Sequence, residues 1–353
     1  MGVPRTCFGC RDQCKLCPKN GGPFFRKSGR RLIPESHIPN PHLNIAPALD
    51  CWYLTGATAV GKTRIALALA ARLGAEILSL DSMAVYRGMD IGTAKPSRAE
   101  QALVPTHLID LVEPNEEFSV AQYLDAALAK IAEVRSRGKE VLFVGGTPLY
   151  LKCLLRGMFT GPPANWELRQ EIQAECERVG PEKLHEHLKV IDPLAASAIH
   201  PNDARRIIRA LEVYRATGEP ISHQQMEFEE GRPAEACRVF VLRRERTEQH
   251  QRIEQRVESM LAAGLVNEVR TLTAGSKELG RTARQAVGYA EVLEHLAGKI
   301  DLTTMTDQIK AHTRRFAKRQ GTWFRSLSEC RFVDLVGEAD AEEVAERIAS
   351  RVQ

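Results

Sequence analysis

Gly56-Ala57-Thr58-Ala59-Val60-Gly61-Lys62-Thr63 is the stretch that decides the fold, because it matches the pattern G-x-x-x-x-G-K-[ST] in full. The apolar run Cys51 to Leu54 precedes it, and the helical pattern of Ile65 to Leu73 follows it. A glycine-rich loop between a strand and a helix points its backbone N–H groups and the helix N-terminus at one anion. The stretch therefore predicts a loop that cradles a diphosphate.

The last two residues of this loop predict different contacts with the ligand. Lys62 supplies a mobile positive charge for the phosphates, and the hydroxyl of Thr63 suits Mg²⁺, which we expect as cofactor. The loop by itself leaves open which diphosphate binds and whether a phosphoryl group moves.

Polar side chains follow two further buried strands. Glu76–Leu80 ends at Asp81, and Val141–Val144 ends in Gly145-Gly146-Thr147. Apolar strands that alternate with helices predict an α/β fold, a P-loop NTPase-like parallel sheet with helices on both faces. Ligands gather at the carboxyl edge of such a sheet, so Asp81 is a candidate general base and Thr147 a candidate hydroxyl donor. The structural alternatives are a turn aspartate and a helix cap.

The length of 353 residues predicts more than one domain. Pro162-Pro163 separates the first part of the sheet from a charged helical block, and Arg238–Leu242 predicts a strand that returns to it. We expect a Cys- and Arg-rich extension (1–47), the first part of the core (48–160), a helical insertion (161–235), the core completion with basic helices (236–330) and a C-terminal tail (331–353).

The N-terminal extension accounts for the net positive charge of the chain. Residues 1–31 have a net charge of +7, whereas the whole chain has +4, so nucleic-acid contacts in the body must come from local clusters. Cys7, Cys10, Cys14 and Cys17 leave three interpretations open: a dispensable extension, a small metal knuckle or a redox cluster. The N-terminus has no apolar segment of a signal peptide, and no apolar run spans a bilayer, which predicts a cytoplasmic protein without membrane contact.

Three predicted helices carry clusters of positive charge. Arg205, Arg206 and Arg209 lie close together without an intervening acid, which suits phosphate groups. Arg252 and Arg256 are an i,i+4 pair that suits either a diphosphate or surface ion pairs. Thr313–Arg325 combines five basic residues with aromatic ones, a pattern typical of contact with RNA loops. On this last helix we expect Phe316, Gln320 and Trp323 to pack.

Taken together, these features resemble the tRNA dimethylallyltransferase (tRNA isopentenyltransferase) family over about residues 52–330. The resemblance is carried by an ordered set of motifs: Gly56–Thr63, Asp81-Ser82-Met83 with Tyr86, Gly88–Pro96, Gly145-Gly146-Thr147 with Leu149-Tyr150, His200–Asp203, Arg205–Tyr214, Gly288-Tyr289, and Ala317–Gln320 with Thr322-Trp323. Where the family usually has Gln, this chain has Ala84.

The resemblance implies that a dimethylallyl group moves from dimethylallyl diphosphate to N6 of the adenosine immediately 3′ of the anticodon in tRNA. It makes Asp81 and Thr147 catalytic, Gly56–Thr63 the diphosphate loop, and the protein a monomer that binds the tRNA anticodon loop. It also implies tRNA contacts at Asp81, Ser82, Met83, Ala84, Arg169, Arg205, Arg206, Ile207, Ile208, Arg209, Gln285, Ala286, Val287, Gly288, Tyr289 and Ala290.

Three alternatives remain at this point. A small-molecule P-loop kinase leaves the arginine helix and the basic C-terminal helix without a role. An adenylate isopentenyltransferase, which prenylates free nucleotide, needs less RNA-binding surface. A non-catalytic RNA-binding protein has no use for Asp81 and Thr147 beside an intact phosphate loop.

Overall fold

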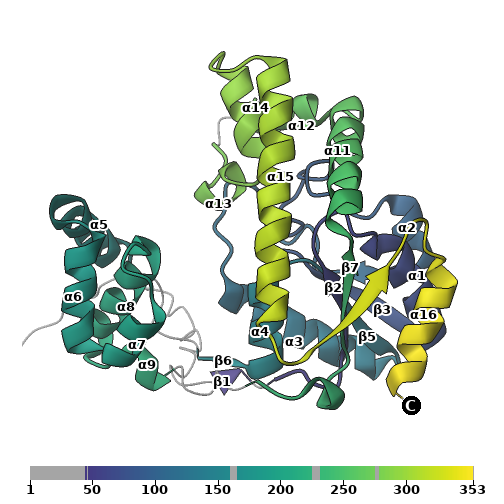
Figure 1. The fold of residues 1–353 in the computed structure, drawn as a ribbon, viewed down its shortest axis with the longest axis horizontal. Coiled ribbons are helices and arrows are strands. Elements are labelled where there is room, and N and C mark those ends of the chain that lie inside the picture. The colour runs from purple at the N-terminus through teal and green to yellow at the C-terminus, as the bar shows by residue number, and fades with distance from the viewer. Residues whose placement is uncertain (1–43, 46, 160–164, 225–230, 275–277, 353) are drawn as a thin grey trace, which may run out of the picture. The chain divides into compact units, whose positions relative to one another are not determined.

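The computed structural model describes residues 44–45, 47–159, 165–224, 231–274 and 278–352. Its centre is a six-stranded parallel sheet with the order β4-β3-β5-β2-β7-β8 (Figure 1). The strands are β2 (Trp52–Gly56), β3 (Ala75–Leu80), β4 (Thr106–His107), β5 (Glu140–Gly145), β7 (Val239–Arg244) and β8 (Cys330–Leu335). The parallel α/β fold expected from the sequence is confirmed. Cys7, Cys10, Cys14, Cys17 and the rest of the predicted extension up to residue 43 lie outside the described residues.

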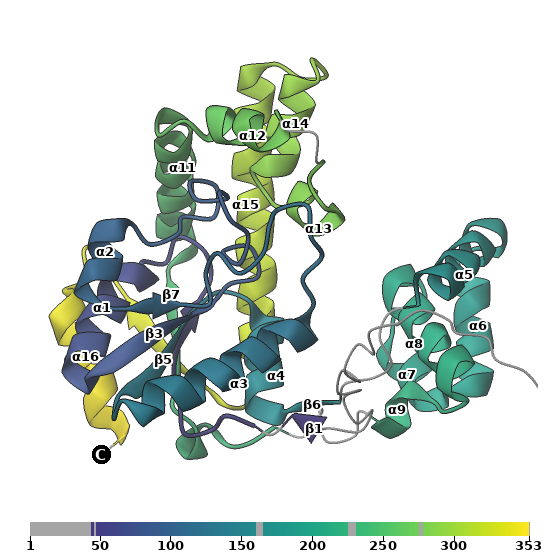
Figure 2. The same cartoon turned by 180° about the vertical axis from the view of Figure 1, so that it is seen from behind.

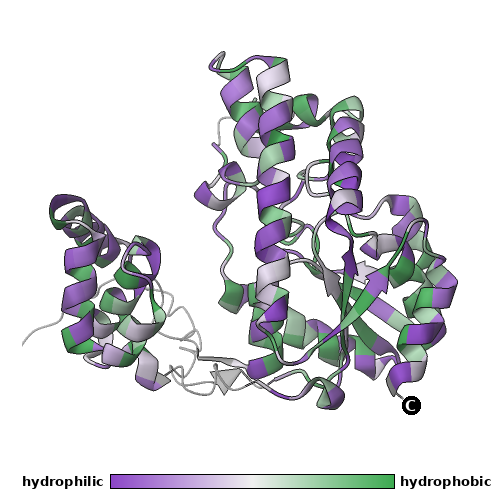
Figure 3. Ribbon diagram, viewed as in Figure 1, coloured by the Kyte–Doolittle hydropathy of each residue, from purple (hydrophilic) through white to green (hydrophobic). Residues whose placement is uncertain are grey.

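Helices cover both faces of the sheet. On one face lie α1 (Lys62–Leu73) and α16 (Ala341–Ala349), and on the other lie α3 (Val120–Ser136), α4 (Pro148–Arg156) and the end of α15 (Leu302–Arg325) (Figures 1 and 2). Each face has its own apolar core. The strands are correspondingly hydrophobic on both sides, whereas the helices carry a hydrophilic outer face (Figure 3).

The C-terminal segment differs from its prediction as a tail. Strand β8 pairs in parallel with β7, and α16 packs against α1 through Val344 and Ile348. An apolar strand followed by an amphipathic helix buries area at the open edge and on one face of the sheet, so these residues complete the core.

A second helical layer follows β7. It consists of α11 (Arg246–Ala262), α12 (Leu265–Thr273), α13 (Arg281–Arg284), α14 (Tyr289–Leu296) and α15, which share a core that includes Met305 and Ile309. The chain turns between α13 and α14. Gly288 has φ of 95°, a value that other residues rarely adopt, and its N–H donates to the buried Glu291 (2.7 Å).

The insertion between β5 and β7 is helical where the structure describes it. It contains α5 (Trp166–Val179), α6 (Pro181–Ile191), α7 (Pro193–Ala198), α8 (Ala204–Thr217) and α9 (Ile221–Gln224), and it has its own apolar core. The remaining elements are short. Strand β1 (Asn44–Ile45) pairs with β6 (Met158–Phe159), α2 (Arg98–Leu103) and η1 (Ala234–Ala236) lie between larger elements, and η2 (Ser350–Val352) follows α16. Within the described ranges, no helix has both the length and the apolar character needed to cross a bilayer.

Candidate active site

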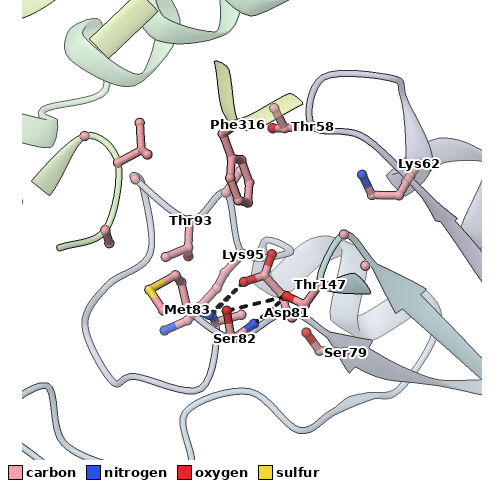
Figure 4. Close-up of a pocket in the computed structure, with 18 of the residues that line it drawn as sticks. Thr58, Lys62, Ser79, Asp81, Ser82, Met83, Thr93, Lys95, Thr147 and Phe316 are labelled. Carbon is pink, nitrogen blue, oxygen red and sulfur yellow. Dashed lines mark hydrogen bonds between the residues drawn. The ribbon is translucent and has the colours of Figure 1, made fainter. Parts of the chain in front are cut away.

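A cavity of about 460 Å³ opens at the carboxyl edge of the sheet, where the predicted polar residues meet. Figure 4 shows Asp81 beside Ser82 and Thr147, with Lys62 and Thr58 on the side of the phosphate loop. The sequence-predicted residues that line this cavity are Thr58, Lys62, Thr63, Asp81, Ser82, Met83, Ala84, Thr147, Arg205, Arg256, Gln285, Ala286, Val287, Gly288 and Tyr289. The structure thus brings the expected diphosphate loop and the expected catalytic pair into one chamber.

Hydrogen bonds from neighbouring elements hold the backbone conformation of the phosphate loop. Gly61 has φ of 98° and Ala59 has φ of 62°, so a non-glycine residue sits in the left-handed region at a cost of about 1 kcal/mol. Side chains of the second helical layer and β7 bind its carbonyls: Arg244 donates to Val60 O (2.9 Å) and Gln249 to Thr58 O (3.1 Å). These bonds compensate the strain and fix the backbone of the loop.

The Lys62 ammonium group lines the cavity, where it can bind an anion. Its ammonium donates to the carbonyl oxygens of Gly56 and Ala57, both at 2.9 Å. Burial and the positive charge of Arg256 lower the pKa of Lys62 to about 7, whereas Asp81 acts in the opposite direction. An anionic ligand would restore the charge that this desolvated amine is close to losing.

The two arginines of the predicted i,i+4 pair have different surroundings. Arg252 donates to Ala59 O (3.3 Å) and pairs with Glu338 (3.3 Å), so it supports the loop from outside the cavity. Arg256 lines the cavity, and burial lowers its pKa while Asp81 opposes that effect. Within the described residues no carboxylate lies within ion-pair distance of Arg256, so of the two arginines it is the one available to a diphosphate.

Asp81 stabilises a turn and also lines the cavity. Its Oδ1 accepts hydrogen bonds from the N–H groups of Met83 (2.8 Å) and Ala84 (3.3 Å), which form the turn after β3. The carboxylate lines the cavity and acts electrostatically on both Lys62 and Arg256. The turn therefore fixes the carboxyl group without removing it from the chamber.

Thr147 stands at the N-cap position of α4, but its hydroxyl makes no capping bond. Its Oγ1 accepts from the Ser82 N–H (3.1 Å), and its own N–H donates to Leu80 O (3.1 Å). The hydroxyl thus joins the loop after β5 to the turn that carries Asp81. The Thr147 hydroxyl therefore does not cap α4, which was the structural alternative.

Gln320 links the phosphate loop to the loop after β5, a role that the sequence analysis missed. Its Oε1 accepts from Thr58 N–H (2.9 Å), and its Nε2 donates to Gly146 O (2.6 Å). The expectation that Gln320 only packs is wrong, because the buried amide satisfies two backbone groups of the site. The Ala-Lys-Arg-Gln motif in the family resemblance was the available signal. Phe316, from the same helical stripe, lines the cavity.

Glu268 binds a segment that lines the cavity, a role that the sequence analysis also missed. Its carboxylate accepts from the N–H groups of Ile91 (2.7 Å) and Gly92 (3.3 Å) and from the Tyr289 hydroxyl (2.5 Å). A Cβ on Gly92 would lie 2.3 Å from the Tyr289 ring, so glycine is required there. Lys95 anchors the same segment to Asp110 (2.6 Å). No local sequence pattern predicts this contact, because Glu268 lies far from Ile91 and Gly92 along the chain.

Several residues expected to touch tRNA do not line the cavity. Ile207 and Ile208 are buried in the core of the helical insertion, so they hold α8 in place. Arg169 and Arg209 both pair with the buried Glu212, at 2.6 and 3.0 Å. The remaining positions outside the lining are Arg206, which is exposed, and Ala290, which is half-buried.

A second cavity, of about 550 Å³, lies on another side of α15 and has a cationic lining. Arg246, Arg315 and Lys318 line it, as does Ala57 of the phosphate loop. The lining contains no acidic side chain, so the cavity suits a polyanion such as RNA.

The donor set of the main cavity fits the expected Mg²⁺. The hydroxyl of Thr63 and the carboxylate of Asp81 are hard oxygen ligands in one chamber with room for a diphosphate. Among the described residues, no group of three or more His, Cys, Asp or Glu side chains gathers as a closed metal site. A site built from one or two side chains and substrate phosphates is the arrangement that Mg²⁺ prefers.

The parallel sheet and the phosphate loop after its β2 strand define a P-loop α/β protein. The family model for IPP transferase matches residues 84–327. A relative from Rhodopirellula baltica, a tRNA dimethylallyltransferase, is 47% identical over 312 residues, which cover 86% of this chain and 93% of that protein. The chain belongs to the IPP transferase family, as the motifs predicted.

Solved structures agree with this assignment. The tRNA isopentenylpyrophosphate transferase of Bacillus halodurans matches with a TM-score of 0.61 and 38% identity, over 86% of this chain and 96% of that one. A eukaryotic dimethylallyltransferase acting on tRNA matches with a TM-score of 0.66 and 27% identity, over 80% of this chain and 73% of that one.

Proposed function

We propose that this chain transfers a dimethylallyl group from dimethylallyl diphosphate to N6 of the adenosine immediately 3′ of the anticodon in tRNA. The products are N6-dimethylallyladenosine and diphosphate. The observation that carries the proposal is that Asp81 and Thr147 line the same cavity as Lys62 and Arg256. A proton acceptor and a diphosphate site in one chamber are what an alkylation of an amine by a prenyl diphosphate needs.

Asp81 acts as the general base in this proposal. The N6 lone pair is delocalised into the adenine ring, so the amine is a weak nucleophile and must lose a proton as its new bond forms. N6 attacks C1 of the dimethylallyl group, the C1–O bond breaks with its electron pair going to the diphosphate, and Asp81 takes the amine proton. Thr147 holds the turn of Asp81 through Ser82 N–H.

The phosphate loop stabilises the leaving group. Negative charge grows on the diphosphate as the C1–O bond breaks, and Lys62, Arg256 and the loop N–H groups face that charge in a desolvated site. Mg²⁺, held by Thr63 and the diphosphate, supplies further charge neutralisation when bound.

The tRNA side of the site consists of the turn after β3, the segment before α14 and the arginines of α8. An unpaired anticodon-loop base leaves its stack more cheaply than a base in a duplex, so the target adenine can enter the cavity. We also propose that the protein acts as a monomer in the cytoplasm, which size-exclusion chromatography with light scattering and cell fractionation would test.

Transfer of labelled dimethylallyl from its diphosphate tests the proposal. The acceptors are unmodified tRNA, the same tRNA with guanosine in place of the target adenosine, and free AMP. Label on the first acceptor alone supports the proposed reaction. Label on AMP alone identifies a free-nucleotide prenyltransferase, and ATP hydrolysis without label on any acceptor identifies a kinase-like enzyme.

A further inference from the structure

Trp166 is a large aromatic side chain exposed on the helical insertion. It is 49% exposed at the first turn of α5 and lies outside the apolar core of this region. Its backbone position is fixed, because Asn165 caps the helix by accepting from Leu168 N–H (3.1 Å). An exposed indole at a rigid position offers a large flat apolar face, with a polar N–H edge, to a partner.

The cation beside this indole is held in place. The Arg169 guanidinium lies 5.0 Å from the centroid of the Trp166 ring. Glu212 fixes it, accepting from Arg169 Nη2 (2.6 Å) and Nε (3.1 Å). Glu212 also accepts from Asn165 N–H (2.9 Å), so one buried carboxylate positions both the ring's helix and its cation.

The helix face that carries the ring also carries cationic and amide side chains. Along α5, Trp166, Arg169, Gln170 and Gln173 follow the i, i+3, i+4, i+7 spacing of one helix face, whereas Glu171 falls on another face. The neighbouring helix α8 contributes three further arginines near its start: Arg205, Arg206 and Arg209. An aromatic ring beside a guanidinium group, with further arginines on the neighbouring helix, is a combination that binds unpaired nucleotides.

We propose that Trp166 and Arg169 form a stacking platform for an unpaired nucleobase of the bound tRNA. The indole stacks on the base, and the surrounding arginines bind the adjoining phosphates. This inference rests on the proposed function, because it takes tRNA as the partner.

Intrinsic fluorescence tests the platform directly. An unmodified tRNA anticodon stem-loop is titrated into the wild-type protein, W166F and W323F, without dimethylallyl diphosphate. W323F measures the share of the quenching that comes from the basic helix α15, on which Trp323 is 42% exposed. We expect quenching in the wild type and in W323F, and loss of most of the quenching in W166F. Quenching in W166F equal to the wild type would overturn the platform.

A kinetic measurement separates stacking from a general structural effect. We expect W166A to raise the KM for tRNA about tenfold, because base–aromatic stacking contributes on that scale. The KM for dimethylallyl diphosphate, kcat at saturating tRNA and the thermal unfolding curve should not change, and W166F should restore part of the affinity. An unchanged KM for tRNA with transfer intact overturns the platform alone. A wild-type protein that neither binds the stem-loop nor modifies tRNA overturns the proposed function as well.

Discussion

Replacing Asp81 by asparagine separates the turn that this residue forms from the chemistry that we assign to it. Oδ1 accepts from the N–H groups of Met83 and Ala84, and the asparagine carbonyl oxygen can accept the same two bonds. Asp81→Asn therefore keeps the local structure and removes the negative charge and the proton acceptor. Asp81→Ala removes all three.

The expected magnitude follows from these contacts. Loss of a positioned general base lowers kcat by about 10² to 10⁴, which corresponds to about 3 to 5 kcal/mol in the activation free energy. The two turn bonds change from charged to neutral acceptors, a loss of about 1 to 2 kcal/mol in the free energy of unfolding. The charge of Asp81 raises the pKa of Lys62, so its removal also weakens diphosphate binding near neutral pH.

The assay is single-turnover transfer of labelled dimethylallyl to tRNA, with enzyme in excess and both substrates saturating. Filter binding of tRNA and thermal unfolding of both variants serve as controls. We expect both variants to be equally inactive, with Asp81→Ala the less stable. A rate for Asp81→Asn within about threefold of the wild type, well short of the range expected for a lost base, would refute the role as base and leave Asp81 as a turn residue.

Three further predictions concern the same site. The pKa of Lys62 is lowered to about 7, and the amine is charged below that pH and neutral above it. We therefore expect kcat/KM for dimethylallyl diphosphate to fall as the pH rises above about 7, and Lys62→Met to lack this step in its pH profile; a step only near the ordinary pKa of lysine would contradict the burial argument. Arg256→Gln should raise the KM for dimethylallyl diphosphate about tenfold or more in a steady-state assay. Arg252→Gln removes only a support of the loop outside the cavity, so it should raise this KM less. A larger increase in Arg252→Gln than in Arg256→Gln would show that the wrong arginine has been assigned to the diphosphate. Gly145→Ala should destabilise the protein by at least about 3 kcal/mol in urea unfolding, since its Cβ would lie 2.1 Å from Leu80 O, and an unchanged midpoint would show that the two strand ends move apart freely.

Sequence patterns predicted most of the regular elements, because their signals are local. Helix α3 begins after Ser119 with Gln122 in a capping box and ends near Gly138, as the caps indicate. The predictions that are wrong concern segments whose structure depends on contacts with residues distant in the sequence. The segment predicted as a C-terminal tail forms most of strand β8 and the whole of helix α16, because β7 and α1 pack against them.

The phosphate loop and its flanking strand and helix were determined by the sequence alone, because eight contiguous residues carry both the required backbone conformation and the binding groups. The carboxyl-edge positions of Asp81 and Thr147 followed from the same local logic, because parallel strands end at one edge. Only the tertiary structure decided which cations face the cavity. Arg252 and Arg256 are the same residue type on one helix, and they differ only in what packs opposite them: Arg252 meets the back of the phosphate loop, and Arg256 meets the open chamber.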